Sequence, residues 1–324
     1  MSTAPDRGRF PRVSIGISSC LLGQEVRFNG GHKRDSFVVG PLSEFVDYVP
    51  ICPEVAIGMG IPRPPIRLVG DATRPRAVGV DAPSLDVTED LERFARRTAA
   101  TLDHISGYIL KKDSPSCGME RVKVYRAGGG PPERKAVGAY ARVILEKWPL
   151  LPVEEEGRLN DPVLRENFVT RVFVYRRWQD LIGRGLTAAR LIEFHSDHKY
   201  LVMAHSQAGY QRMGRLLSNL SGVDLDAVGD YYLRELMTTL KRRVNRKRHS
   251  NVLQHIMGYL KRRIDSDDKA ELIQTIDAYR RGEVPLIVPV TLLRHYLRRH
   301  PDPYMDRQYY LRPHPDKLSL RNAI

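Results

Sequence analysis

The pattern of apolar and polar positions changes once along this chain, near residue 160. Before that point short apolar runs alternate with segments of helical period, and after it only helical patterns follow. Short β-like runs that alternate with helices are typical of an open sheet whose strands are mostly parallel. The sequence therefore predicts an α/β N-terminal domain with a mostly parallel, Rossmann-like three-layer sheet, followed by an all-α C-terminal domain.

In the first 150 residues the expected elements are short. Strands are predicted at 12–17, 48–51 and 106–110, with a pair of short strands within 66–80. Helices are predicted within 36–48, over 86–105 and over 136–148. Thr88 stands at the start of the 86–105 helix, where a threonine side chain can cap the first turn.

Residues 149–162 have the composition of a linker, with three prolines and the acidic run EEE. We therefore place the domains at 1–152 and 160–324. Helical patterns in the second domain cover 161–183, 186–206, 208–220, 230–264 and 268–282. The pattern over 230–264 loses its phase near RHSN (248–251), which indicates two helices.

Composition narrows the class of protein. Hydrophobic residues make up 42% and charged residues 28% of the 324 positions, which is typical of a soluble globular protein. The first residues have no apolar signal core, and the apolar stretch at 284–293 is much shorter than the roughly 20 residues of a membrane span. Three cysteines cannot all pair within one chain, which argues against a disulfide framework. We expect a cytoplasmic protein without membrane contact.

The net charge of +14 favours anionic partners such as nucleotides or RNA. Most of the excess lies in residues 151–324, where the runs LKRRVNRKRHSN (240–251) and LKRR (260–263) have tyrosines nearby. Cations interleaved with aromatic groups are a footprint of RNA binding, and a solvated helix face is the alternative. His195, His198 and His205 share one helical stripe, and packed histidines explain them better than a metal site.

Each of the three cysteines comes after a predicted strand. Cys20 closes RVSIGISSC, Cys52 follows YVPI, and Cys117 follows GYILKKDSPS. The carboxyl ends of the strands of an open α/β sheet form the edge at which ligands bind. Three thiols at that edge predict a metal site, whereas simple packing of buried cysteines is the alternative.

The spacing of the cysteines also narrows the choice of metal. Thiolates suit zinc and iron–sulfur clusters, but the C-x₂-C spacings of structural zinc sites and of ferredoxins are missing. Three cysteines would leave one iron of a cubane cluster without a protein thiolate. Such an iron is open to a ligand and can act as a Lewis acid.

Four motifs in this order resemble the thiouracil desulfidase family over roughly residues 10–150. They are SSCLLG (18–23), RFNGGHKR (27–34), CPE (52–54) and KKDSPSCG (111–118). The remainder, with EFHSDHKYLVMAHSQ (193–207), resembles an uncharacterised helical domain that is often fused to desulfidases. In the motif VRFNGG, Val26 and Asn29 stand where many relatives have Cys and Asp.

The resemblance implies a specific activity. It implies a [4Fe-4S] cluster held by Cys20, Cys52 and Cys117, with the substrate sulfur on the fourth iron. The implied reaction removes sulfur from a thiolated pyrimidine, thiouracil or thiouridine monophosphate. It gives a carbonyl and hydrogen sulfide without net redox change.

The proton transfers and substrate binding that this reaction requires suggest roles for side chains near the cysteines. Glu54, two residues after Cys52, is the natural acid or base, with helix capping as the alternative. Ser114 can hydrogen-bond a pyrimidine or a water and is favoured over Ser116, although either can simply stabilise the turn. Asn29 and Gly30 bind the base or order their loop. The cations that can meet a phosphate, unless they are only solvated surface charge, are Arg27, His32, Lys33, Arg34, Arg63 and Lys112.

Three alternatives to a small-molecule desulfidase follow from the same residues. One is an RNA-binding protein whose cysteines hold a structural metal, and another is desulfuration of thiolated tRNA through the basic helices. A radical enzyme is disfavoured because the C-x₃-C-x₂-C spacing is absent. The helical domain would cover the site, shape an oligomer or present a larger substrate.

Overall fold

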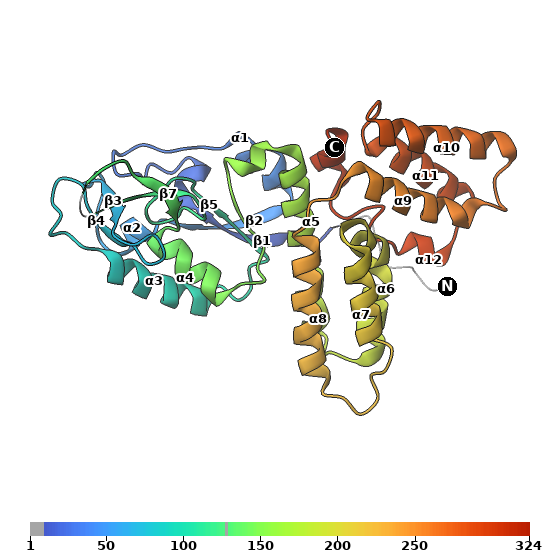
Figure 1. Ribbon diagram of the computed structural model, residues 1–324, viewed down its shortest axis with the longest axis horizontal. Coiled ribbons are helices and arrows are strands. Elements are labelled where there is room, and N and C mark those ends of the chain that lie inside the picture. The colour runs from blue at the N-terminus through green and yellow to red at the C-terminus, as the bar shows by residue number, and fades with distance from the viewer. Residues whose placement is uncertain (1–9, 127–128) are drawn as a thin grey trace. The chain divides into compact units, whose positions relative to one another are not determined.

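The computed structural model describes residues 10–126 and 129–324, which form two compact units, with the boundary along the chain between Asn160 and Asp161. We call residues 10–160 the α/β unit and residues 161–324 the helical unit (Figure 1). This confirms the predicted fold class. None of the described helices is long and apolar enough to cross a membrane.

The first sheet of the α/β unit contains four parallel strands in the order β2-β1-β5-β8. Its strands are β1 (Val13–Ser18), β2 (Val46–Ile51), β5 (Gly107–Leu110) and β8 (Val153–Glu155). The strand β5 is buried along its whole length, as expected for a strand inside a parallel sheet that is covered on both faces.

A second sheet of four strands, in the order β4-β3-β6-β7, was not expected as a separate layer. Its strands are β3 (Ile66–Val69), β4 (Arg76–Gly79), β6 (Val122–Tyr125) and β7 (Glu133–Ala136). The predicted strand pair within 66–80 is the antiparallel pair β3 and β4. The sequence pattern missed β6 and β7, because they are only four residues long and β7 carries three charged residues.

Short and long helices complete the α/β unit. They are α1 (Ser36–Val39), α2 (Pro53–Ala56), α3 (Thr88–Thr101) and α4 (Ala139–Lys147). The helices α3 and α4 pack side by side (Figure 1). Tyr140 of α4 stacks on Phe94 of α3, and its hydroxyl lies 3.0 Å from that of Tyr108 on β5. Both helices also contribute side chains to the core that covers the second sheet.

Thr88 does not cap α3. Its hydroxyl accepts a hydrogen bond from the backbone N–H of Ala77 at 2.7 Å and lies 2.6 Å from a carboxylate oxygen of Asp86. The same oxygen of Asp86 accepts from the N–H of Thr88 at 3.0 Å. Instead of capping the helix, the Thr88 side chain connects the start of α3 to strand β4.

The linker prediction for 149–162 is also wrong, because β8 lies inside this segment and pairs with β5. Glu154, Glu155 and Glu156 are all buried, with less than a tenth of each residue exposed. Glu154 pairs with Arg158 at 2.6 Å. An acidic run that resembles a solvated connection is thus part of the sheet and its edge.

The helical unit consists of eight α-helices among its residues, all of which are described. They are α5 (Pro162–Gly183), α6 (Ala188–His205), α7 (Gln207–Leu216), α8 (Leu225–Leu240), α9 (Arg246–Met257), α10 (Ser266–Arg281), α11 (Ile287–Arg299) and α12 (Pro303–Asp306). The helices α6, α7 and α8 pack together, as do α9, α10 and α11 (Figure 1). The predicted 230–264 pattern is indeed two helices, separated at 241–245 rather than at RHSN.

Buried polar groups tie the helical unit together. Glu166 of α5 accepts a hydrogen bond from Nε of Arg321 at 3.2 Å, and Arg321 also donates to the carbonyl of Tyr310 at 2.6 Å. His205 bonds the carbonyl of Arg242 at 2.7 Å, and His198 bonds that of Phe194 at 2.7 Å. The prediction that the histidines of the stripe are packed or hydrogen-bonded is confirmed for His198 and His205.

Burial makes this unit sensitive to acid. Desolvation lowers the pKa of His205 to about 4, below the ordinary value of 6.5. Between these two values the unfolded chain binds a proton that the folded chain refuses, so stability falls as the pH drops from 6.5 towards 4. We expect His205→Gln, which keeps an N–H donor, to reduce the loss of unfolding free energy between pH 7 and pH 5 by about 1–2 kcal/mol. The unfolding free energies are measured by urea unfolding, followed by Trp178 fluorescence in a Trp148→Phe background. Equal losses of unfolding free energy in the parent and in His205→Gln would contradict the prediction.

Candidate functional site

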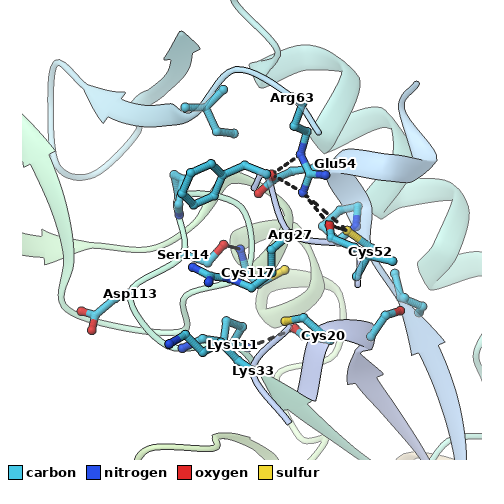
Figure 2. A pocket seen from close by; sticks show the side chains of 18 of the residues that line it. Cys20, Arg27, Lys33, Cys52, Glu54, Arg63, Lys111, Asp113, Ser114 and Cys117 are labelled. Atoms are coloured by element: carbon cyan, nitrogen blue, oxygen red, sulfur yellow. Dashed lines mark hydrogen bonds and ion pairs between the residues drawn. The ribbon is translucent and has the colours of Figure 1, made fainter. Parts of the chain in front are cut away.

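The three cysteines lie at one edge of the first sheet because their strands are neighbours. Cys52 directly follows β2, Cys20 lies in the turn after β1, and Cys117 lies in the loop after β5, and the sheet order is β2-β1-β5. All three side chains line one cavity of about 270 Å³ (Figure 2). Parallel strands thus bring together thiols that are far apart in the sequence.

Each sulfur has its own polar support within a largely apolar setting. Burial raises the pKa of Cys20 to about 11 and that of Cys117 well above its usual range, so both are neutral thiols when nothing positive is bound. Lys111 and Arg27 act against this shift at Cys20, and the Ser18 hydroxyl does so at Cys117.

Cys52 is only half-buried, and burial raises its pKa too. The backbone N–H groups of Val55 and Glu54 point at its sulfur and oppose that rise. Backbone donors of this kind stabilise a thiolate that is bound to a metal. All three cysteines therefore suit the thiolate form once a cationic group is present in the cavity.

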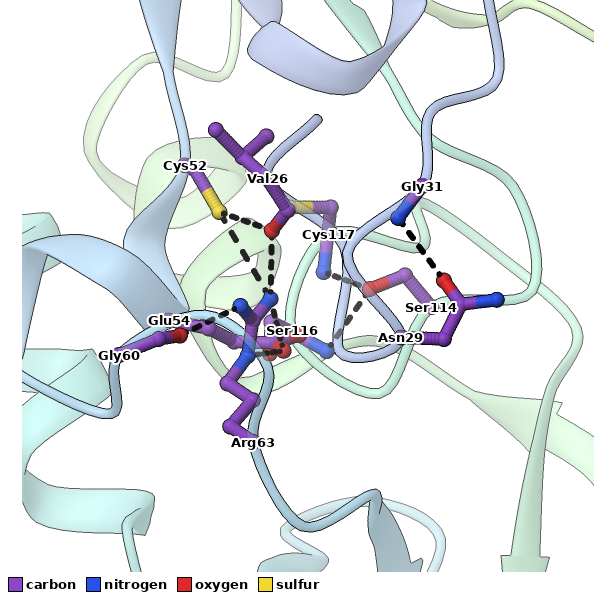
Figure 3. A network of polar contacts seen from close by, with 10 residues as sticks. All are labelled: Val26, Asn29, Gly31, Cys52, Glu54, Gly60, Arg63, Ser114, Ser116 and Cys117. Carbon is purple, nitrogen blue, oxygen red and sulfur yellow. Dashed lines mark hydrogen bonds and ion pairs between the residues drawn. The ribbon is translucent and has the colours of Figure 1, made fainter. Parts of the chain in front are cut away.

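A network of polar contacts connects the Cys52 and Cys117 loops (Figure 3). One carboxylate oxygen of Glu54 pairs with the guanidinium of Arg63, at 2.7 Å from Nη2 and 2.8 Å from Nε. The other oxygen accepts a hydrogen bond from the Ser116 hydroxyl at 2.7 Å. Glu54 is thus fixed from two sides, and the oxygen that accepts from Ser116 retains a lone pair for a further partner.

Ser114 lines the same cavity, and its backbone neighbours decide what its hydroxyl can do. The oxygen accepts from the N–H of Ser116 at 3.2 Å and from the N–H of Cys117 at 3.0 Å. Since a hydroxyl has two acceptor positions and one proton, Ser114 is left as a hydrogen-bond donor. Ser116 is fully buried and does not line the cavity, and its hydroxyl donates to Glu54 instead.

The other predicted residues divide between the cavity and the surface. Arg27, Lys33 and Lys112 line the cavity, and among the described residues none of the three is in an ion pair. Asn29 and Gly30 lie outside the cavity wall: the Asn29 side chain accepts from the N–H of Gly31 at 3.3 Å, and Gly30 takes a left-handed turn with φ +71°.

Two predicted phosphate-binding cations, His32 and Arg34, are exposed and do not line the cavity. Arg63 does line it, but its side chain is only 3% exposed and its donors are engaged within the protein. The expectation that Arg63 meets a phosphate is therefore wrong.

Two carboxylates that the sequence reasoning missed hold the Cys117 loop. Glu156 pairs with the Lys111 ammonium at 2.5 Å and accepts from the N–H of Lys112 at 2.8 Å. Glu155 accepts from the N–H of Met119 at 2.7 Å, and burial raises its pKa. The signal that could have revealed them is the apolar run LLPV immediately before EEE, which is typical of a strand.

Within residues 10–126 and 129–324, no group of three or more His, Cys, Asp or Glu side chains is placed to hold a single metal ion.

Comparisons with known proteins agree with this division of the chain. Residues 15–156 match the family model described as 2-thiouracil desulfurase. The chain belongs to the 2-thiouracil desulfurase family. Residues 199–315 match a second model, described as a protein of unknown function (DUF1722). The predicted family resemblance is confirmed for both halves.

Two curated proteins are similar to parts of this member of the family. The uncharacterized protein YbgA of Escherichia coli (strain K12) is 32% identical over 159 residues, which are 49% of this chain and 94% of YbgA. The uncharacterized protein YbbK of Bacillus subtilis (strain 168) is 34% identical over 151 residues, which are 45% of this chain and 97% of YbbK. A solved structure of the [4Fe-4S]-dependent thiouracil desulfidase TudS is 28% identical, with a TM-score of 0.38, and covers 49% of this chain and all of TudS.

The Cys117 loop has no room behind it. A Cβ atom on Gly138 would lie 2.5 Å from the carbonyl oxygen of Ser116 and 2.9 Å from the nitrogen of Cys117. We expect Gly138→Ala to displace this peptide, to destabilise the protein by about 1–3 kcal/mol and to speed alkylation of Cys117. Thermal unfolding and mass-spectrometric mapping of alkylated cysteines measure these effects.

Gly183→Ala is the matched control, because nothing lies within 4 Å of the added Cβ. It should leave both the stability of the fold and the labelling of Cys117 close to those of the parent. A Gly138→Ala protein in which Cys117 stays as protected as in the parent would show that the loop is not held in this way.

Proposed function

We propose that this protein is a desulfidase that removes sulfur from a thiolated pyrimidine, with water as the second substrate. The reaction replaces C=S by C=O and releases hydrogen sulfide, so atoms balance and no electrons are transferred. The observation that carries the proposal is that three thiols, a fixed carboxylate and a donor hydroxyl line one cavity. Membership of the 2-thiouracil desulfurase family supports it.

Cys20, Cys52 and Cys117 would hold a [4Fe-4S] cluster in this cavity. The fit rests on the three thiols and on their supporting donors, namely the backbone of Glu54 and Val55, the Ser18 hydroxyl and the cations Arg27 and Lys111. When bound, such a cluster supplies a Lewis acid with affinity for sulfur at the iron that has no protein ligand.

Glu54 and Ser114 are the candidate catalytic residues. Glu54 is the carboxylate held beside Cys52, and the free lone pair on the oxygen bonded to Ser116 allows it to pass the two protons of the attacking water, one after the other, to the departing sulfur. Ser114, with both acceptor positions filled by backbone N–H groups, donates a hydrogen bond to an acceptor on the pyrimidine or to the water.

The cations of the cavity suit an anionic substrate. Lys111 is neutralised by Glu156, and Asp113 pairs with Arg134 at 3.1 Å. Arg27, Lys33 and Lys112 remain without an ion pair in the described part of the chain. Thiouridine monophosphate, which carries a phosphate, is therefore favoured over the free base thiouracil.

Anaerobic turnover of thiouridine monophosphate by the iron-reconstituted protein tests the proposal through sulfide release. We expect Cys117→Ala to lose both iron and turnover, and Glu54→Gln to keep iron while its kcat falls by about 10²-fold or more. Asp113→Asn is the matched control, a carboxylate at the same cavity that should change kcat little. A parent protein with a full cluster and no sulfide from either the base or the nucleotide would reject the small-molecule desulfidase.

A second candidate substrate is thiolated RNA, and the surface of the helical unit favours it. Six cations between Lys241 and Arg248 are exposed and form no ion pair among the described residues. Beside them is a groove of about 570 Å³ whose lining includes Lys247, Arg248 and His255 but no carboxylate. Phosphate backbones bind to such surfaces by displacing counterions.

Charge reversal in this basic segment separates the two substrates. We expect Arg243→Glu/Lys247→Glu to weaken binding of thiolated tRNA and to reduce its salt dependence, while turnover of thiouridine monophosphate is kept. Arg280→Glu/Arg299→Glu makes the same change in net charge outside the segment and serves as the control. Equal tRNA affinity for both double variants, measured by filter binding across salt concentrations, would exclude a specific role for residues 241–248.

A further inference from the structure

Arg63 is an unusual cation in this chain because its side chain is only 3% exposed. Arginine is rarely buried unless its donors are paired, since the loss of hydration must be compensated. The proposed reaction assigns no role to Arg63, and its position next to the cavity excludes a simple surface function.

The guanidinium contacts three separate segments. Nε and Nη2 pair with Glu54, Nη1 donates to the carbonyl of Gly60 at 3.0 Å, and Nη2 donates to the carbonyl of Val26 at 2.9 Å. Nη2 also lies 3.9 Å from the sulfur of Cys52 (Figure 3). One planar group thus fixes the distance between a carboxylate and the sulfur two residues before it.

The backbone holds Arg63 itself in place. Its N–H donates to the carbonyl of Phe28 at 2.9 Å, so the residue is attached to the 26–28 loop through both its main chain and its side chain. On the far side of Glu54, the Ser116 hydroxyl donates a hydrogen bond to the other carboxylate oxygen. The contacts therefore run from the 26–28 loop through Arg63 and Glu54 to the Cys117 loop.

We propose that Arg63 is a positioning residue, which acts through Glu54 and Cys52 by holding the carboxylate and the sulfur in one fixed arrangement. This inference rests on the proposed function, in which Glu54 transfers protons and Cys52 holds the cluster. Lysine cannot replace Arg63, because a single ammonium cannot place donors on Glu54, Gly60 and Val26 in the plane of a guanidinium.

Arg63→Lys tests the proposal, with Arg142→Lys as the matched control. Arg142 forms a comparable buried pair with Glu92, 2.5 Å apart with side chains 11% and 10% exposed, and does not line the cavity. In the reconstituted protein we expect Arg63→Lys to lower kcat by about 10–100-fold per cluster with KM changed less than about threefold. Arg142→Lys should lower stability without this separation of kcat from KM.

Two further measurements do not depend on turnover. The electron paramagnetic resonance spectrum of the reduced cluster should change in Arg63→Lys, because Nη2 approaches the Cys52 sulfur, and should stay the same in Arg142→Lys. In the cluster-free protein, a double-mutant cycle of Arg63→Met and Glu54→Gln should show coupling between the two residues in thermal unfolding.

The outcomes separate the two proposals. Sulfide release by the parent with unchanged kcat in Arg63→Lys would overturn the positioning role and leave the desulfidase intact. Parallel losses of stability, iron and kcat in the Arg63 and Arg142 variants would also overturn it, since they indicate a structural role alone. If the parent releases no sulfide, the desulfidase fails, and an unchanged resonance spectrum with an additive cycle would then reject the Arg63 proposal independently.

Discussion

The carboxylate of Glu54 forms an ion pair with Arg63 on one side and accepts a hydrogen bond from Ser116 on the other. The geometry of the cavity depends on these two contacts. The three cysteines come from three loops, and loops at a sheet edge have little apolar packing to fix them. A buried ion pair with further hydrogen bonds supplies that rigidity. Removing one partner would leave an uncompensated charge in the protein, so the loops are held together as one unit.

A second pair of carboxylates holds the two ends of the Cys117 loop. At the end of β8, Glu155 accepts a hydrogen bond from the backbone N–H of Met119, and Glu156 accepts one from that of Lys112. The loop is therefore attached to the sheet near both of its ends, while Ser114 organises its centre. Backbone N–H groups that bond to carboxylates inside a protein form strong, short contacts. A thiol presented by such a loop has a defined position before any metal binds.

Sequence patterns were sufficient to place the cysteines at the ends of strands, because the apolar run that marks a strand and the direction of the chain are both visible locally. The pattern RVSIGISSC places Cys20 at the end of a buried strand without any knowledge of its partners. Glu156 and Arg63 differ, because their burial depends on Lys111, 45 residues away, and on Val26, 37 residues away. A charged residue in isolation resembles solvated surface, and its partner is revealed only when the chain is folded. The same reason explains why EEE resembled a linker.

The cations around the cavity can be assigned to different tasks by their partners. Lys111 and Arg27 lower the pKa of Cys20 against the effect of burial, so they favour the thiolate form that a metal requires. Lys111 is also neutralised by Glu156, and Arg27 lies 5.4 Å from the ring centre of Phe28. Among the described residues, neither Lys33 nor Lys112 forms an ion pair or lies over an aromatic ring. In the proposed reaction, a phosphate on the substrate would therefore meet these two lysines before Arg27, which also acts on the Cys20 sulfur.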